Sequence, residues 1–196
     1  MTDAAARPLD GLVLILGGRG SGKTVLLQKI ERRYRTAGHH FTIWDMLGYW
    51  KELPGRTVVR SDDAEEAAME AIRRAPTTFV VDEAADAYPS DHRLKPKTAL
   101  TEIARKGRQA SAVGRFRRRG PVAAILAAQR PMDIAPGLKN LVDRLFLLGF
   151  PATAASDIAW VEDAVERIQP GQGRAIAALL PRLTVGQYVT IAAKSR

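Results

Sequence analysis

The sequence contains no cysteine, which excludes disulfide bonds and metal sites built from thiolates. It also lacks any apolar run approaching the roughly 20 residues that a membrane-spanning helix needs. The N-terminal stretch Met1–Gly11 has no apolar segment of the kind found in secretion signals. By default, these absences lead us to expect a cytoplasmic location.

Acidic residues are missing from one long stretch, Ile103–Met132. The basic residues in this stretch are Arg105, Lys106, Arg108, Arg115, Arg117, Arg118, Arg119 and Arg130. The chain has a net charge of +9, so these eight residues account for nearly all of the excess. A local patch of this kind, in contrast to an evenly basic surface, indicates a polyanionic partner.

The chain has 196 residues, of which 46% are hydrophobic, as expected for a globular protein with a substantial core. We expect a single domain over residues 1–196, with residues 1–10 as a loose lead-in. No internal repeat or low-complexity tract divides the sequence.

A phosphate-binding loop is predicted at Gly17–Thr24, which reads GGRGSGKT. The apolar run Leu12–Leu16 before it is typical of a strand buried on both faces, and helical periodicity follows it. Glycines let the backbone curl so that its N–H groups point at phosphate oxygens, and the next helix presents its positive end to them. We expect Lys23 to reach the β- and γ-phosphates and the Thr24 hydroxyl to bind Mg²⁺. The predicted phosphate-contacting residues are Gly18, Arg19, Gly20, Ser21, Gly22, Lys23, Thr24 and Val25.

Two acids follow a second apolar run, Thr77–Val81. At the end of this predicted strand, Asp82 is expected to hold the Mg²⁺ shell, and Glu83 to polarise the attacking water. A solvated turn after a core strand is the alternative for this pair. Their position about 60 residues after the glycine loop favours the functional interpretation.

Gln129 follows the apolar run Val122–Ala128, the next core strand that we expect after the Asp82–Glu83 strand. An amide at this position can lie beside the γ-phosphate and sense its presence. The alternative is a simple hydrogen-bonded strand terminus.

The remaining pattern predicts further elements in both halves of the chain. Strands are expected at Phe41–Trp44, Thr57–Val59 and Arg144–Phe150, with Arg174–Leu180 and Leu183–Ile191 as a terminal hairpin. Helices are expected to Ala37 after the glycine loop, from a cap at Ser61 or Asp62 to Arg74, over Lys97–Val113 and over Ala152–Ile168.

Four motifs in this order, GGRGSGKT, FVVDEA, ARKGRQ and ILAAQRP, resemble those of the FtsK–HerA superfamily of DNA-pumping ATPases. The compact size most resembles the genome-packaging ATPases of membrane-containing icosahedral viruses. The resemblance implies an α/β fold of the RecA-like (ASCE) P-loop NTPase class, with a mostly parallel central sheet flanked by helices and a C-terminal β-hairpin. The RFRRRG segment departs from the family pattern as an insertion between the predicted helix and the strand that ends at Gln129.

Carried over residue by residue, the resemblance implies ATP and Mg²⁺ as cofactors and ATP hydrolysis coupled to DNA movement. Lys23, Glu83 and Gln129 then form the catalytic set. An arginine finger is expected from a neighbouring subunit, with Arg105 and Arg108 as candidates and Arg130 behind them. This requirement implies a homo-oligomeric ring, a pentamer or hexamer, with a viral capsid or membrane vertex as a further partner and the host cytoplasm or virion as its location.

The RFRRRG segment supplies four candidates for contact with the backbone of DNA: Arg115, Arg117, Arg118 and Arg119. We expect this DNA to be double-stranded and to be bound without sequence preference. A solvated surface loop is the alternative for these residues.

Two other function classes stay open at this point. A small phosphotransferase such as a nucleotide kinase has a similar length, a phosphate-binding loop and an arginine-rich lid. The Asp82–Glu83 pair and Gln129 at the end of its predicted strand argue against it, because a kinase must not activate water. The second class is a nucleotide-gated nucleic-acid-binding assembly protein in which hydrolysis is vestigial.

Overall fold

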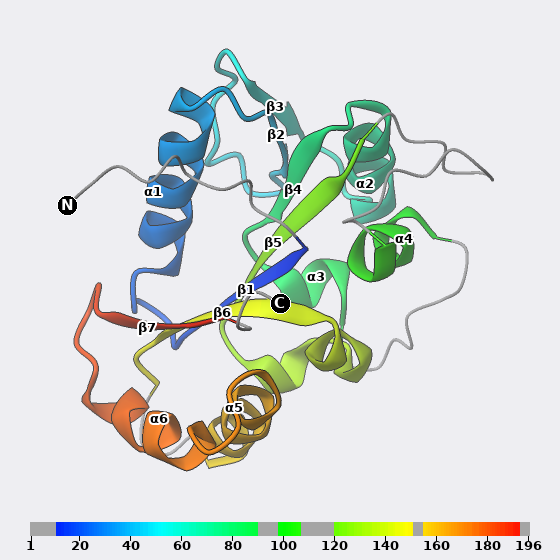
Figure 1. Ribbon diagram of the computed structural model, residues 1–196. Coiled ribbons are helices and arrows are strands. Elements are labelled where there is room, and N and C mark those ends of the chain that lie inside the picture. Colours follow the sequence, from blue (N-terminus) through cyan, green and yellow to red (C-terminus); the bar gives the residue numbers. More distant parts are fainter. Residues whose placement is uncertain (1–10, 90–97, 107–119, 151–154, 193–196) are drawn as a thin grey trace.

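A mostly parallel, seven-stranded sheet forms the centre of the protein in the computed structural model, which describes residues 11–89, 98–106, 120–150 and 155–192 (Figure 1). The strand order is β3-β2-β4-β5-β1-β6-β7, and β7 alone among these strands runs antiparallel to its neighbour. The strands are β1 (Leu12–Leu16), β2 (Phe41–Trp44), β3 (Arg56–Val59), β4 (Thr77–Val81), β5 (Val122–Ala128), β6 (Val142–Leu148) and β7 (Tyr188–Ala192). The predicted fold class is therefore confirmed.

The three central strands β4, β5 and β1 consist of buried residues only. Their sequences are continuous apolar runs, apart from the threonines that open β4, because helices cover both faces of the sheet and no face is left for water. The sequence pattern placed these three strands at their observed bounds.

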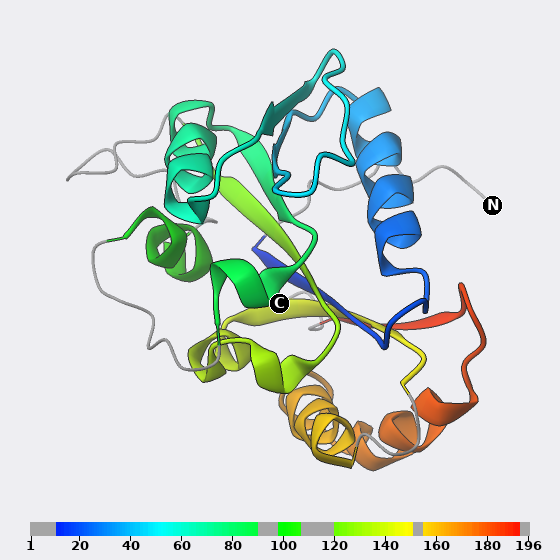
Figure 2. The ribbon, with the colours of Figure 1, turned by 180° about the vertical axis from the view of Figure 1, so that it is seen from behind.

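Helices form one layer on each side of the sheet (Figures 1 and 2). The α-helices are α1 (Lys23–Thr36), α2 (Ala64–Arg73), α3 (Ala84–Ala87), α4 (Ala99–Lys106), α5 (Ala155–Ile168) and α6 (Gly173–Leu179). Three short 3₁₀ turns complete the described elements, η1 (Pro131–Asp133), η2 (Pro136–Asn140) and η3 (Leu180–Arg182). The core on one face of the sheet contains buried residues of α1, whereas the core on the other face contains those of α2 to α6.

A buried ion-pair network fixes α1 against the edge of the sheet. Glu31 of α1 is completely buried and accepts hydrogen bonds from Nε of Arg35 (2.8 Å) and Nε of Arg56 in β3 (2.9 Å). The network therefore holds the C-terminal half of α1 against β3.

The C-terminal region differs from the predicted hairpin of Arg174–Leu180 and Leu183–Ile191, and its last strand, β7, begins only at Tyr188. Residues 174–180, predicted as a strand, form α6 and the start of η3 instead. Ile176, Ala177 and Leu180 are buried at helical spacing, so the small apolar residues of this segment suit one helix face against α5. The antiparallel strand pair near the C-terminus is present, but β7 pairs with β6 across the intervening helices.

The start of α2 also corrects a prediction. Asp63, rather than Ser61 or Asp62, is the N-cap, and its side chain accepts a hydrogen bond from the backbone N–H of Glu65 (2.9 Å). Asp86 lies in the short helix α3.

The helix predicted over Lys97–Val113 is seen as α4 up to Lys106, where the described segment ends. Among the described helices, none has the length and apolar character required to cross a membrane.

The carboxyl ends of β1, β5 and β4 meet at one edge of the sheet. Leu16 at the end of β1 is level with Ala128 at the end of β5, and Val81 at the end of β4 is level with Leu126. Since neighbouring strands lie about 4.8 Å apart, the residues that follow these ends must lie close together. Parallel α/β sheets bind ligands at this edge.

Candidate active site

The glycine loop is shaped by close packing at Gly17 and by left-handed backbone at Gly20 and Gly22. A side chain at Gly17 would place its Cβ 2.6 Å from Oγ of Ser21 and 2.7 Å from Cβ of Leu148, so only glycine fits. Gly22, which precedes α1, has a φ of 100°, a conformation that favours glycine. The Gly18 N–H donates to the carbonyl of Gly149 (2.9 Å), which ties the loop to the end of β6.

Lys23 is the first residue of α1, and its ammonium group lies inside this loop. Nζ donates hydrogen bonds to the carbonyl oxygens of Gly17 (2.8 Å) and Gly18 (3.1 Å). Burial lowers the pKa of Lys23, while the nearby carboxylates of Glu83 and Asp82 act in the opposite direction. A cation is thus held within the loop, where an anionic phosphate chain would need it.

Thr24 and Asp82 face each other across the gap between α1 and the end of β4. The Thr24 hydroxyl donates to Oδ1 of Asp82 at 3.2 Å. Burial is the main cause that raises the pKa of Asp82, and the Thr24 hydrogen bond and the Lys23 charge oppose it. The two oxygens that the sequence assigned to Mg²⁺ therefore lie within hydrogen-bond distance of each other.

Glu83 and Gln129 are joined by a hydrogen bond between the ends of β4 and β5. Nε2 of Gln129 donates to Oε2 of Glu83 at 3.1 Å. Burial raises the pKa of Glu83 most, and the Gln129 hydrogen bond partly offsets it. The sequence predicted both residues for the site but not this contact, since it depends on β5 lying beside β4.

A pocket of about 240 Å³ joins these groups. Its lining includes Lys23, Thr24, Asp82, Glu83 and Gln129, together with Arg19 and Gly20 of the loop. The lining residues that no motif in the sequence indicated are Trp44, Asp45, Met46, Leu47, Tyr49 and Asp86.

Among these additional residues, Asp45 holds the loop beside the pocket through hydrogen bonds. It is 4% exposed, and its carboxylate accepts from the backbone N–H groups of Tyr49 (3.0 Å) and Trp50 (2.8 Å). These two bonds fix the loop that walls the pocket. Because Asp45 stands at the carboxyl end of β2, the rule that selected Asp82 could have selected it as well.

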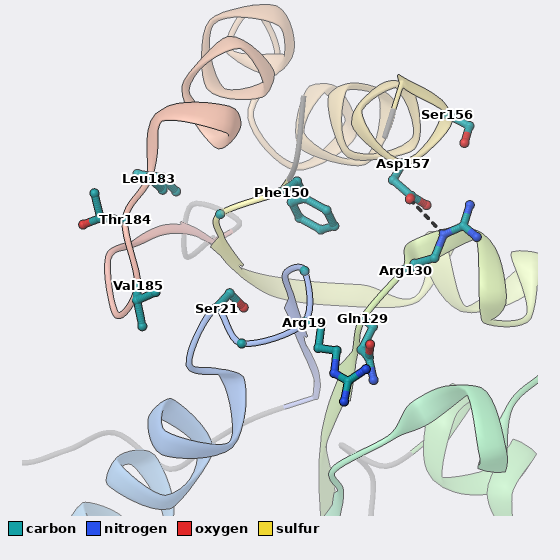
Figure 3. Close-up of a pocket in the computed structure, with 13 residues that line it drawn as sticks. Arg19, Ser21, Gln129, Arg130, Phe150, Ser156, Asp157, Leu183, Thr184 and Val185 are labelled. Atoms are coloured by element: carbon teal, nitrogen blue, oxygen red, sulfur yellow. Dashed lines mark hydrogen bonds and ion pairs between the residues drawn. The ribbon is translucent and has the colours of Figure 1, made fainter. Parts of the chain in front are cut away.

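A larger cleft of about 740 Å³ opens on the other side of the glycine loop (Figure 3). Gly149 and Phe150 at the end of β6, Ser156 and Asp157 in α5, and residues 183–185 line it opposite Gly18–Ser21. The segment 183–187 is fastened to the loop, because the Gly186 N–H donates to the Ser21 carbonyl (3.1 Å). No motif in the sequence predicted that these C-terminal residues line a cleft beside the glycine loop.

The predicted arginines lie in different places. Arg105 is exposed on α4 and is not among the residues that line either cavity. Arg130 lines the larger cleft, where its Nε donates to Oδ2 of the buried Asp157 at 3.1 Å (Figure 3). Val25, a predicted phosphate contact, is exposed in the first turn of α1. Arg108, Arg115, Arg117, Arg118 and Arg119 lie outside the described residues.

Comparison with known proteins gives matches at the level of structure alone. No family model and no curated protein matches the sequence. The genome-packaging NTPase B204 from Sulfolobus turreted icosahedral virus 2, solved in complex with sulfate, matches with a TM-score of 0.69 and 17% identity, over 94% of this chain and 92% of that one. B204 in complex with ATP-γS matches with a TM-score of 0.69 and 16% identity, over 95% and 94%.

The pCW3 conjugation coupling protein TcpA, in its monomer form with ATP-γS, is more distant. It matches with a TM-score of 0.51 and 16% identity, over 93% of this chain and 57% of TcpA. At these identities the likeness is one of fold. The protein therefore shares the fold of the B204 NTPase, and the fold that the sequence motifs led us to expect is confirmed.

Proposed function

We propose that this protein, which has the fold of a viral genome-packaging NTPase, hydrolyses ATP and couples the reaction to movement of DNA. The observation that carries the proposal is the meeting of five side chains around one pocket, two from the first turn of α1 and three from the ends of β4 and β5. They are Lys23, Thr24, Asp82, Glu83 and Gln129. Each of the five is the residue type that phosphoryl transfer to water requires at its position.

In the proposed reaction the oxygen of a water molecule attacks the γ-phosphorus in line with the bond to the β-phosphate. That bond breaks, the bridging oxygen leaves with ADP, and the proton of the water passes to the Glu83 carboxylate before it is released. Burial raises the pKa of Glu83, which makes its carboxylate a stronger base than an exposed one. Lys23 neutralises the negative charge of the phosphate oxygens.

Mg²⁺ suits the donors that this chain offers. Thr24 and Asp82 supply two hard oxygen atoms in contact with each other, and the described residues contain no cluster of three or more His, Asp or Glu that could hold a metal. Mg²⁺ prefers one or two protein oxygens together with phosphate oxygens and water. When bound, it would supply charge neutralisation for the β- and γ-phosphates.

Gln129 has two roles in this proposal. Before ATP binds, its amide holds the Glu83 carboxylate through the 3.1 Å hydrogen bond. A γ-phosphate in the pocket competes for the same N–H donor and thereby frees Glu83 to bind the attacking water. In this way Gln129 links the presence of ATP to the activation of the base.

The proposed coupling of ATP hydrolysis to DNA movement has its own support. The fold likeness to B204 and TcpA and the acid-free basic stretch Ile103–Met132 support it. Contacts with phosphates carry no sequence information, which suits a motor that moves along any DNA. We further propose a homo-oligomeric ring in which an arginine of one subunit completes the site of the next, as hydrolysis of this type gains roughly 10³- to 10⁵-fold from such a residue.

The test is ATP hydrolysis by the full chain with and without duplex DNA, in the parent and in Glu83→Gln. We expect turnover that DNA stimulates, and a loss of at least about 10²-fold in Glu83→Gln with ATP binding retained. Turnover indifferent to DNA would contradict the motor. A Glu83→Gln variant as active as the parent would contradict the assignment of the base, and transfer of phosphate to a nucleotide acceptor would indicate a kinase.

A further inference from the structure

Arg19 stands at the junction of the two cavities beside the glycine loop. The lining residues that the 240 Å³ pocket and the 740 Å³ cleft share are Arg19, Gly20 and Gln129. In Figure 3 the side chains of Arg19 and Gln129 extend in the same direction, away from Phe150. A cation and the amide proposed to sense the γ-phosphate thus border the same space.

The backbone on both sides of Arg19 is fixed. Gly18 is tied to Gly149 through the 2.9 Å hydrogen bond, and Gly20 has a φ of 74° that favours glycine. The loop therefore holds the Cα of Arg19, while the exposed side chain is free to turn toward a ligand. The guanidinium makes no hydrogen bond or ion pair with any residue that the structure describes.

The charges around the pocket leave room for a second cation. Four carboxylates line the pocket, those of Asp45, Asp82, Glu83 and Asp86. The cations among its lining residues are Lys23 and Arg19, and Lys23 is already held by two loop carbonyls. The charge that develops on the γ-phosphate during hydrolysis needs further neutralisation, which a planar guanidinium provides through two parallel hydrogen bonds.

We propose that Arg19 is a catalytic residue that acts within its own subunit, where its guanidinium binds γ-phosphate oxygens beside Gln129. The inference rests on the proposed hydrolysis and adds to it a source of positive charge in the same chain as the loop. It is separate from the arginine expected from a neighbouring subunit. The competing interpretation is an exposed arginine that only adds to the general attraction of anions.

The experiment measures steady-state ATP hydrolysis and ADP binding for Arg19→Ala and Arg19→Lys in the full chain. We expect Arg19→Ala to lower kcat by roughly 10²-fold, the usual cost of removing one charge-stabilising donor, with ADP affinity within about threefold of the parent. Arg19→Lys should fall between the two, because it keeps the charge and loses the fork. Arg32→Ala, on the exposed side of α1, is the matched control and should behave as the parent does.

Mixing experiments separate action in the same subunit from action in a neighbour. Lys23→Ala subunits cannot hold the phosphates, but they still carry Arg19. Mixed with Arg19→Ala subunits, they should restore no hydrolysis, because each working loop still lacks its own arginine. Restored turnover in the mixture would overturn the inference in favour of an arginine acting on a neighbour.

Two further outcomes would also overturn it: an Arg19→Ala variant with the parent's kcat, or one that loses ADP and ATP affinity equally at unchanged kcat. If the parent itself hydrolyses no ATP, the proposed function fails and this inference falls with it. A parent that hydrolyses ATP normally beside an unaffected Arg19→Ala variant overturns only the role of Arg19.

Discussion

At the scale of single residues, the space around Gly17 decides whether the loop can form. The Cβ of an alanine there would meet Oγ of Ser21 at 2.6 Å and Cβ of Leu148 at 2.7 Å, and the second atom belongs to the rigid end of β6. Overpacking of this kind costs about 1–3 kcal/mol.

We therefore expect Gly17→Ala to lower the free energy of unfolding by that amount and to weaken ADP binding. Urea denaturation and ADP titration measure the two effects. Adding Ser21→Ala removes only the hydroxyl contact, so the double variant should recover only part of the stability. Full recovery would show that Leu148 does not limit the space.

At the scale of elements, the cap of α2 gives a direct test of the corrected helix start. Asp63 accepts the N–H of Glu65, whereas Asp62 lies before the cap. Loss of an N-cap side chain costs about 1 kcal/mol. Asp63→Ala should lose that much stability in chemical denaturation, and Asp62→Ala, the matched control, should lose little. Equal losses would place the cap elsewhere.

His40, the residue before β2, contacts two further strands, and we expect it to make stability depend on pH. Its ring lies 3.0 Å from Oγ1 of Thr77 in β4 and 3.3 Å from Oγ1 of Thr57 in β3. Burial lowers the pKa of His40 first, and the charge of Arg74 lowers it further. The unfolded chain, with an ordinary His pKa near 6.5, therefore binds more protons as the pH falls, and the folded state loses stability.

We expect the free energy of unfolding to fall as the pH is lowered from about 7.5 through 6.5 toward the lowered pKa of His40. His40→Gln should flatten this part of the profile, because it removes the titrating group. Urea titrations at several pH values measure it, and an unchanged slope in the variant would assign the dependence to other groups.

At the scale of the whole molecule, the basic stretch should set how salt affects DNA binding. The affinity of a protein for duplex DNA falls with salt by a slope of about 0.9 for each phosphate that it neutralises. Replacing Arg115, Arg117, Arg118 and Arg119 by glutamine should lower the slope by about 0.9 for each of these arginines that binds a phosphate, while ATP hydrolysis without DNA is kept.

Binding to labelled duplexes of unrelated sequence, at several salt concentrations, measures this slope. Arg32→Gln with Arg33→Gln on the exposed side of α1 is the control, and should leave the slope as it is. An unchanged slope in the fourfold variant would remove these arginines from the DNA-contact surface.

The sequence by itself determined the strands that are buried on both faces of the sheet. Leu12–Leu16, Thr77–Val81 and Val122–Ala128 are found at their predicted bounds, because a strand buried on both faces needs an uninterrupted apolar run. The residue pattern GGRGSGKT likewise predicted the glycine loop between a strand and a helix. Residues 174–180 were assigned wrongly because a short apolar run suits a strand and a helix equally, and packing against α5 decided for the helix.

Only the tertiary structure decided which side chains meet. The Gln129–Glu83 hydrogen bond exists because β5 lies between β1 and β4, and the attachment of Gly186 to Ser21 exists because the chain returns from α6 to the glycine loop. Asp45 and Arg19 came to line the same pocket through the same folding. Local sequence sets the conformation of each segment, but contacts between distant segments depend on the order and register of the strands, which no single segment encodes.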